Sequence, residues 1–292
     1  MNDRFRSIPY LFAAPAIIVM AIGLGWPVIE SLRLSMYELR LGETITPTAF
    51  RGLAIFWEAL ADPSVHTSML VTLKYAFVVV VVEMIIGIGL ALLLEKPIRG
   101  MGVFRTIFVL PMMIAPICVG LIWRYMFDTN AGPLNTWLAA INLKPEWLAD
   151  PTLAFMVICV ADIWQFTPFV FIMALAGLQG LDTSSIEAAE IDGATPWQII
   201  RFIKLPLLMP ILMITLLMRL IDALRGLEVV YALTNGGPGL STELFPLHIY
   251  KSAFVTQRMG HSAALSICLL LVTTALSIAI LMRSNPLKRR GE

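Results

Sequence analysis

The stretch YAFVVVVVEMIIGIGLALLL, residues 75–94, contains twenty consecutive residues of which only Glu83 is charged. An α-helix needs about 20 predominantly apolar residues to cross the roughly 30 Å hydrocarbon layer of a bilayer. The stretch therefore predicts a transmembrane helix. A charged residue at this depth is costly, so Glu83 is expected to find a partner inside the protein, to reach toward the interface, or to serve the function.

The rest of the chain repeats this pattern. Six apolar stretches of similar length are separated by more polar loops, at residues 10–29, 75–94, 104–127, 153–177, 207–233 and 263–282. Six spans with their loops occupy most of the 292 residues and leave no room for a soluble catalytic domain. The sequence predicts an all-α integral membrane protein with six transmembrane helices in a single domain, residues 1–292.

The composition excludes other classes of protein. Apolar residues make up 58% of the chain and charged residues 14%, against about 25% charged residues in a typical soluble domain. Disordered chains have the opposite balance. A net charge of +1 gives no reason to expect a nucleic-acid partner. The three cysteines, Cys118, Cys159 and Cys268, lie in apolar runs and are interpreted as small hydrophobic residues.

The first stretch has a second interpretation. Arg4 and Arg6 precede it, as basic residues precede the apolar core of a secretory signal peptide. The apolar run is longer than such a core, however, and continues as far as Pro27 without a small-residue cleavage pattern. An uncleaved first helix is therefore expected.

Basic residues predict the orientation, because cytoplasmic loops carry an excess of Lys and Arg. If the N-terminus is cytoplasmic, eleven basic residues flank the spans on the inside: Arg4, Arg6, Lys96, Arg99, Arg105, Arg201, Lys204, Arg283, Lys288, Arg289 and Arg290. Six lie on the outside: Arg33, Arg40, Arg51, Lys144, Lys251 and Arg258. This bias predicts that both termini are cytoplasmic, with Lys288–Arg290 as an anchor of the topology.

The loop between spans four and five, residues 180–206, has a helical pattern of its own. Ser184 and Glu187 have the spacing of a capping box, and the helix that they begin is expected to end near Gly193. Thr195 and Pro196 then have the pattern of an N-cap and first residue of a second helix. The loop is either a pair of amphipathic helices on the membrane surface or a docking element for a cytoplasmic partner.

The residues of this loop resemble the EAA loop of ABC importer permeases. The match comprises the run EAAEIDGA at 187–194, the run IKLP at 203–206, and Pro210. In that family the loop forms a coupling helix that inserts into a cleft of the ATPase subunit. The resemblance therefore implies that a cytoplasmic coupling helix lies between spans four and five, with ATPase-coupling residues Glu187, Ala188, Ala189, Asp192, Gly193, Leu205 and Pro206.

Other motifs resemble the carbohydrate-uptake branch of this family, which includes maltose, trehalose and glycerol-phosphate importers. They are FR at 104–105 with LP at 110–111, WLADP at 147–151, AGLQ at 176–179 and LTNGGP at 233–238. The Asn-Gly-Gly-Pro run is more typical of the first permease of such a pair. The resemblance implies a bacterial inner-membrane protein that forms half of a translocation pathway for a sugar or sugar derivative.

The same resemblance implies the partners. They are a second homologous permease, two ATPase subunits that hold ATP and Mg²⁺, an extracytoplasmic solute-binding protein, the carbohydrate and the membrane lipid. The chain itself has no Gly-x-x-x-x-Gly-Lys-Ser/Thr phosphate loop. It is therefore expected to be a transport subunit that needs no cofactor and is not an enzyme.

Charged residues inside the spans are candidates for the substrate path, since such charges are functional by default. Arg219, Asp222 and Arg225 are spaced three apart in span five, so they form one polar stripe on a helix. In span four Asp162 stands near two further path candidates, Gln165 and Phe166. The alternative is a structural ladder of ion pairs in which Asp222 is shared between the two arginines and Asp162 of the facing span can take part. A free arginine would suit an anionic sugar.

Two other interpretations compete with an importer. A proton-coupled secondary transporter would use Asp162 or Glu83 as its carrier, but it predicts internal repeats, and the two halves of the sequence show none. A membrane-embedded enzyme would need a catalytic constellation that the acidic residues lack. His66, His248 and His261 have no ligand spacing, so no metal is expected.

Overall fold

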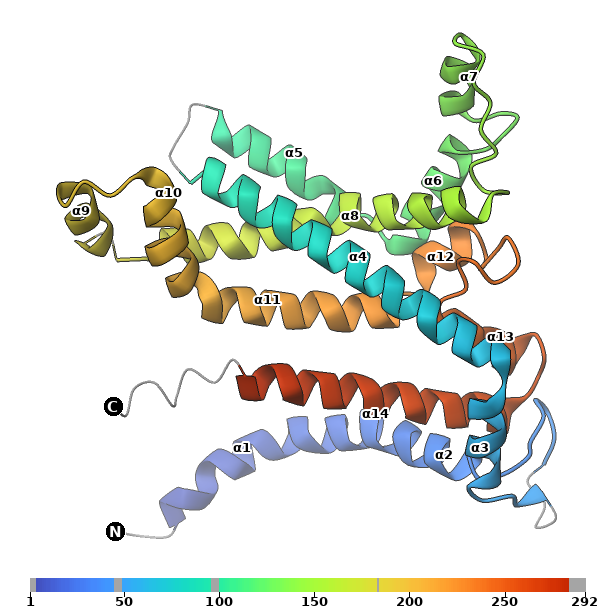
Figure 1. The fold of residues 1–292 in the computed structure, drawn as a ribbon. Coiled ribbons are helices and arrows are strands. Elements are labelled where there is room, and N and C mark those ends of the chain that lie inside the picture. Colours follow the sequence, from blue (N-terminus) through green and yellow to red (C-terminus); the bar gives the residue numbers. More distant parts are fainter. Residues whose placement is uncertain (1–3, 45–48, 96–99, 183, 284–292) are drawn as a thin grey trace. The chain divides into compact units, whose positions relative to one another are not determined.

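The computed structural model describes residues 4–44, 49–95, 100–182 and 184–283. In these ranges the regular structure is helical, apart from two isolated bridges that pair Tyr37 with Phe50 and Arg40 with Arg258 (Figure 1). The α-helices are α1 (Arg4–Met20), α2 (Trp26–Leu34), α3 (Ala54–Ala61), α4 (Pro63–Leu93), α5 (Met101–Met113), α6 (Pro116–Met126), α7 (Pro133–Ala139), α8 (Pro151–Gln179), α9 (Ser184–Ile191), α10 (Pro196–Ile199), α11 (Leu205–Arg225), α12 (Glu228–Leu233), α13 (Phe245–Phe254) and α14 (Met259–Arg283).

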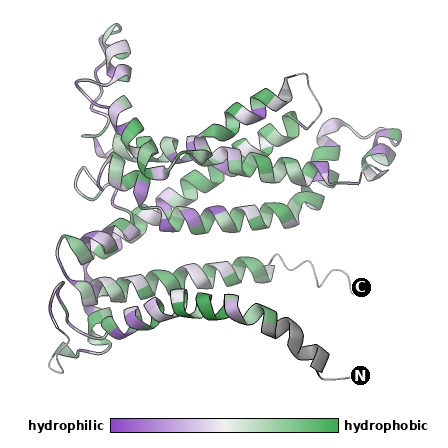
Figure 2. Cartoon of the chain, turned by 180° about the vertical axis from the view of Figure 1, so that it is seen from behind, coloured by the Kyte–Doolittle hydropathy of each residue, from purple (hydrophilic) through white to green (hydrophobic). Residues whose placement is uncertain are grey.

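Five stretches of helix in the described ranges are long and apolar enough to cross a bilayer, and a bent pair makes six if it is counted as one span. The five are Phe12–Leu34, Pro63–Leu93, Pro151–Gln179, Pro196–Leu233 and Met259–Met282, and the bent pair is Gly102–Met113 with Pro116–Met126. Figure 2 shows that the long helices are mostly hydrophobic and that hydrophilic residues gather in the connecting segments. The predicted all-α integral membrane fold is confirmed.

The third predicted span, 104–127, is broken. Its two halves, α5 and α6, meet at an angle of 94°. Ile114 and Ala115 adopt extended ψ angles of 134° and 133° between them. Two prolines flank the break, since Pro111 lies inside α5 and Pro116 begins α6, and the residue before a proline disfavours the helical conformation.

Spans four and five begin at capped helix ends. The carboxylate of Asp150 accepts hydrogen bonds from the backbone N–H groups of Thr152 and Leu153, both at 2.8 Å, which satisfies two donors that a helix start leaves free. Thr195 and Gln198 form the reciprocal capping box at the start of α10. The predicted N-cap at Thr195 is therefore confirmed, and helix continues through a π-helical turn, Ile200–Lys204, into α11.

The chain divides into two compact units. The larger one comprises His66–Leu247 together with the described residues from Thr273 onward. Within it α4, α5, α8 and α11 lie side by side, and the segment that carries α9 and α10 extends past their ends (Figure 1). Buried side chains of α4, α8 and α11 form its core: Ala91, Phe171, Ala174, Leu175, Leu178, Leu208 and Leu212.

The smaller unit comprises the described residues up to Val65 and His248–Val272. Its chain segments are joined by backbone hydrogen bonds, from Leu41 N–H to Gln257 O and from Gly260 N–H to Leu39 O. Arg51 forms ion pairs with Glu38 and Glu58. The loop after span five includes the helix α13.

Several residues of the orientation argument lie outside the described residues. These are Lys96, Arg99, Lys288, Arg289 and Arg290. The single-domain assignment and the orientation of the termini remain predictions.

Candidate functional site

A buried cluster of ion pairs joins three of the spans in the larger unit. Arg219 of α11 donates from Nε to Glu83 Oε2 at 2.7 Å and from Nη2 to Glu83 Oε1 at 2.9 Å. The same Nη2 also donates to Asp162 Oδ2 at 2.9 Å. Glu83 lies on α4 and Asp162 on α8, so one guanidinium group connects three helices.

The cluster is almost completely removed from solvent. The side chains of Arg219, Glu83 and Asp162 are 1%, 0% and 8% exposed. A buried charge is tolerated only when it is paired and hydrogen-bonded, and the two parallel bonds between Arg219 and Glu83 are the strong, bidentate kind. The expectation that Glu83 finds a partner inside the protein is confirmed.

The polar stripe of α11 divides between two environments. Arg219 points into the bundle, whereas Asp222 is 63% exposed and lies 3.8 Å from Arg219 Nη1. Arg225 is exposed, and within the described ranges it forms no ion pair. The alternative of a structural ion-pair ladder is therefore confirmed in part, since Arg219 pairs with Asp162 and Asp222, whereas Arg225 does not share Asp222 in the described ranges.

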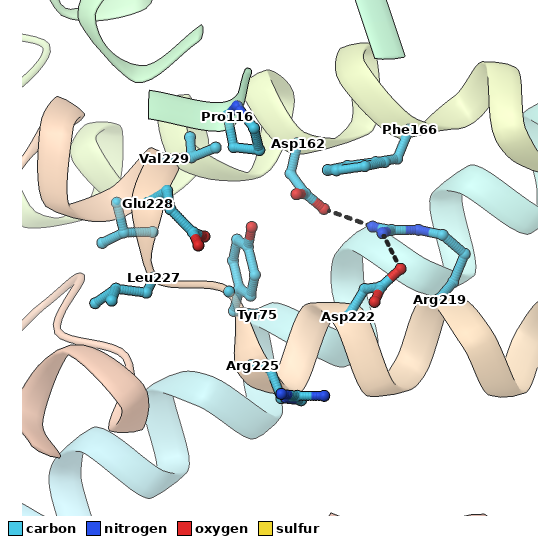
Figure 3. A pocket seen from close by; sticks show the side chains of 12 residues that line it. Tyr75, Pro116, Asp162, Phe166, Arg219, Asp222, Arg225, Leu227, Glu228 and Val229 are labelled. Carbon is cyan, nitrogen blue, oxygen red and sulfur yellow. Dashed lines mark hydrogen bonds and ion pairs between the residues drawn. The ribbon is translucent and has the colours of Figure 1, made fainter. Parts of the chain in front are cut away.

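A cavity of about 370 Å³ opens beside the ion cluster (Figure 3). It is lined by four of the predicted path residues that carry charge, Asp162, Arg219, Asp222 and Arg225, and by the ring of Phe166. That ring lies 4.2 Å from the Arg219 guanidinium carbon, in the geometry of a cation–π contact. The structure thus brings together five of the six predicted path residues. Their role remains a prediction.

Gln165, the sixth predicted path residue, does not line this cavity. Its Nε2 donates a 3.0 Å hydrogen bond to the carbonyl oxygen of Ile114, at the break between α5 and α6. Gln165 is 1% exposed, and its Oε1 is buried without a hydrogen-bond partner in the described structure. A carbonyl that leaves the helical pattern needs another donor, so Gln165 supports the broken span.

The cavity also contains residues that the sequence argument missed. Tyr75 and Glu228 line it, and the Tyr75 hydroxyl points toward Asp162 (Figure 3). Glu228 continues the three-residue spacing of Arg219, Asp222 and Arg225, so extending the stripe by one step would have found it. Tyr75 has no such signal, because nothing in the spacing of α4 places it opposite Asp162.

The loop between spans four and five forms a second candidate site. Five of the predicted coupling residues are exposed, namely Glu187, Ala188, Asp192, Gly193 and Pro206, while the other two, Ala189 and Leu205, are half-buried. Ile191 is 87% exposed. A hollow of about 370 Å³ is lined by Asp192, Gly193, Ala194, Gln198, Phe202 and Ile203. The loop therefore presents both acidic and apolar side chains for contact.

The predicted capping box of α9 is not the arrangement observed. The Ser184 hydroxyl donates to Asp182 Oδ2 at 2.6 Å, and Asp182 Oδ1 accepts from the Ser184 N–H at 3.1 Å. These bonds hold the pKa of the Asp182 carboxyl below its usual value, because they favour its charged form. The aspartate two residues earlier therefore supports the start of α9.

An ion pair ties this loop to another span. Lys204, at the end of the π-helical turn, pairs with Glu95 just beyond α4. Their side chains are 12% and 21% exposed, so the pair is better shielded from solvent than most surface pairs. α4 and α11 are thus joined twice, at Glu95–Lys204 and again at Glu83–Arg219.

Known proteins resemble this chain over most of its length. A family model described as "Binding-protein-dependent transport system inner membrane component" matches residues 83–284. The trehalose/maltose transport system permease protein of Thermococcus litoralis is 35% identical over 83% of this chain and 82% of its own length. The sn-glycerol-3-phosphate transport system permease protein of Agrobacterium fabrum is 32% identical over 93% of this chain and 92% of its own.

A solved structure has the same fold. One chain in the crystal structure of a bacterial alginate ABC transporter, in complex with an alginate pentasaccharide-bound periplasmic protein, superposes with a TM-score of 0.80. The alignment covers 99% of this chain and 96% of that chain at 23% sequence identity.

Proposed function

Because the chain belongs to the family of binding-protein-dependent transport system inner membrane components, we propose that it is one permease of an ATP-driven importer of a sugar or sugar derivative. It is a membrane-spanning transport subunit and not an enzyme. Its partners are a second homologous permease, two ATPase subunits that bind ATP and Mg²⁺, and an extracytoplasmic solute-binding protein. The complex sits in a bacterial plasma membrane with both termini of this chain in the cytoplasm.

The relatives support a carbohydrate or carbohydrate-related solute. One is named for trehalose and maltose and another for sn-glycerol-3-phosphate. A polar solute needs a polar path through the bilayer, and the cavity beside Arg219 supplies polar groups at the level of the spans. Residues Asp162, Phe166, Arg219, Asp222 and Arg225 would contact the solute, with Gln165 supporting the broken span beside them.

The observation that carries the coupling proposal is the exposed loop that contains α9 and α10. A short turn joins α9 to α10, and from α10 the helix continues without interruption into α11, so a displacement of the loop by the ATPase would be transmitted to the span that carries Arg219. ATP-driven closure of the two ATPase subunits would press on Glu187–Gly193 and rock the spans between inward-facing and outward-facing states. The path would thus alternate in its access to the two sides.

The proton-coupled alternative finds less support. Its two carriers would be Asp162 and Glu83, and both carboxylates are hydrogen-bonded to Arg219. The family match and the relatives named as transport-system permeases favour the importer over this alternative.

The coupling proposal is tested at Gly193, whose φ of +78° suits glycine and disfavours β-branched residues. A Cβ at this position would meet no atom within 4 Å, so Gly193→Val changes the backbone preference alone. When the tagged permease is purified from native membranes, we expect Gly193→Val to reduce the ATPase that accompanies it about tenfold or more. The amount of ATPase is read by immunoblot and by nucleotide hydrolysis.

The matched control is Gly193→Asn, because asparagine tolerates positive φ better than valine. This variant should retain most of the ATPase. Both variants should elute from gel filtration like the unaltered permease, which separates loss of docking from loss of folding. Undiminished ATPase with Gly193→Val, or no ATPase with the unaltered chain, would contradict the proposal.

A second prediction concerns the ion pair between Glu95 and Lys204. Glu95→Lys should lower the transport obtained per ATP hydrolysed, because like charges would then separate the loop from α4. The swap Glu95→Lys with Lys204→Glu should restore it. A double-mutant cycle on transport rates should give a coupling energy of about 0.5–3 kcal/mol, and strictly additive effects would show that the pair transmits nothing.

A further inference from the structure

More acidic than basic side chains line the cavity. Three carboxylates, Asp162, Asp222 and Glu228, line it together with two guanidinium groups, Arg219 and Arg225. A fourth carboxylate, Glu83, lies directly against Arg219. By formal charge the lining therefore carries an excess of one negative charge.

Arg219 cannot offset this excess for a ligand, because its charge is already engaged. Both Glu83 and Asp162 accept hydrogen bonds from it at 2.7–2.9 Å, and the three side chains are buried. A third carboxylate, that of Asp222, lies 3.8 Å from Arg219 Nη1, and this nitrogen is buried and so does not reach a solute in the cavity.

The exposed side chains of the cavity also carry more negative than positive charge. Asp222 and Glu228 are exposed carboxylates, and Arg225 is the exposed cation between them in the sequence. A cleft with low-dielectric walls focuses the potential of its charges. A solute that carries a carboxylate or phosphate would meet a net negative potential here, while the single exposed guanidinium group is outnumbered.

Hydroxyl groups fit this lining better than charges do. A hydroxyl both donates and accepts hydrogen bonds, so it can donate to Asp222 or Glu228 and accept from Arg225. The volume of about 370 Å³ lies at the lower end of the range of about 300–1,000 Å³ that is usual for ligand pockets. The cavity therefore has the chemistry of a small polyhydroxylated solute.

We propose that this cavity receives an uncharged polyhydroxylated solute and selects against anionic sugars and sugar phosphates. The inference rests on the proposed function, since it assumes that the cavity belongs to the translocation path. It also replaces the expectation that a free arginine suits an anionic sugar, because Arg219 is held by two carboxylates. The names of the relatives do not decide this question, since one includes a phosphate and another does not.

The test uses probes that differ only in charge. The purified importer complex, without its solute-binding protein, is titrated with glucose, glucuronate and glucosamine, and separately with trehalose and trehalose 6-phosphate. Binding is followed by saturation-transfer NMR, which detects weak ligands. We expect each uncharged sugar to bind about tenfold or more tightly than its anionic counterpart, as a net negative cavity requires.

Variants then assign the selectivity to the cavity. Glu228→Gln together with Asp222→Asn makes the lining formally positive and should reduce the difference between trehalose and trehalose 6-phosphate severalfold. The matched control is Glu146→Gln, an exposed glutamate of the same unit that does not line the cavity. This control should leave the difference unchanged.

Three results would overturn the inference: anionic probes that bind as well as uncharged ones, glucuronate bound as well as glucosamine, or no binding by any probe. None of these results would contradict the proposed function if the ATPase still co-purifies with the chain. Loss of that co-purification from the unaltered permease would remove the proposed function, and with it the reason to treat the cavity as a transport path.

Discussion

Replacing Arg219 with methionine should destabilise the protein more than any other single change to the polar residues of α11. The variant leaves Glu83 and Asp162 buried and without their cation. Removing one partner of a buried ion pair costs about 3–5 kcal/mol, because the remaining charge is left uncompensated in a low dielectric. The loss should appear as a lower yield of folded protein and a lower unfolding temperature in detergent.

A thiol-reactive fluorescent dye can report this unfolding. Cys159 is 4% exposed on α8, only three residues from Asp162, so it should become reactive when the cluster opens. Arg225→Met is the matched control, since Arg225 is exposed and forms no ion pair within the described ranges. That variant should unfold close to the temperature of the unaltered protein.

A triple variant separates the charge effect from packing. Glu83→Gln, Arg219→Met and Asp162→Asn together remove all three charges while nearly preserving volume, and replacement of a whole buried ion cluster is often close to neutral. The triple variant should therefore be more stable than Arg219→Met alone. If it is equally unstable, packing of the arginine stem rather than uncompensated charge accounts for the loss.

The second large effect is expected at Gly87, where α4 meets α8. A Cβ on Gly87 would lie 2.7 Å from Cβ and Cγ1 of Val170 and 3.0 Å from the backbone N of Phe171. Small residues at such points allow membrane helices to approach closely. Gly87→Leu should separate the two helices and cost about 1–3 kcal/mol or more, as overpacking of a core does.

The control for this prediction lies two residues further along the same helix. A Cβ on Gly89 would meet nothing within 4 Å, so Gly89→Leu adds no clash and gains the better helix propensity of leucine, up to about 1 kcal/mol. Unfolding temperatures of the two variants, measured in the same detergent, should thus move in opposite directions. Equal shifts would show that the close approach of α4 to α8 does not contribute to stability.

Whether a feature of this protein could be predicted from the sequence depends on how far apart along the chain the interacting residues lie. The spans and the cap at Thr195 are governed by residues within one or two helical turns, and they could be predicted. The partners of Arg219 could not. Glu83 lies 136 residues away and Asp162 lies 57 away, so their pairing depends on how three helices rotate about their axes.

Gln165 illustrates the same limit inside one span. Its place beside Asp162 and Phe166 predicted a residue of the substrate path, yet its amide is bonded to Ile114 across the bundle. One residue is 100° of rotation on a helix, so neighbours in sequence face different surroundings. Only the packing of α8 against α5 and α6 determines which of them lines the cavity.

The sequence by itself determined that this chain spans a bilayer, where its long helices lie and which loop resembles the EAA loop. Hydrophobic length and helix capping are local properties, so they can be found one segment at a time. The tertiary structure decided which charged side chains pair with one another and which remain exposed at the cavity. That outcome depends on contacts between distant helices, because a charge inside a membrane is defined by the partners that packing brings to it.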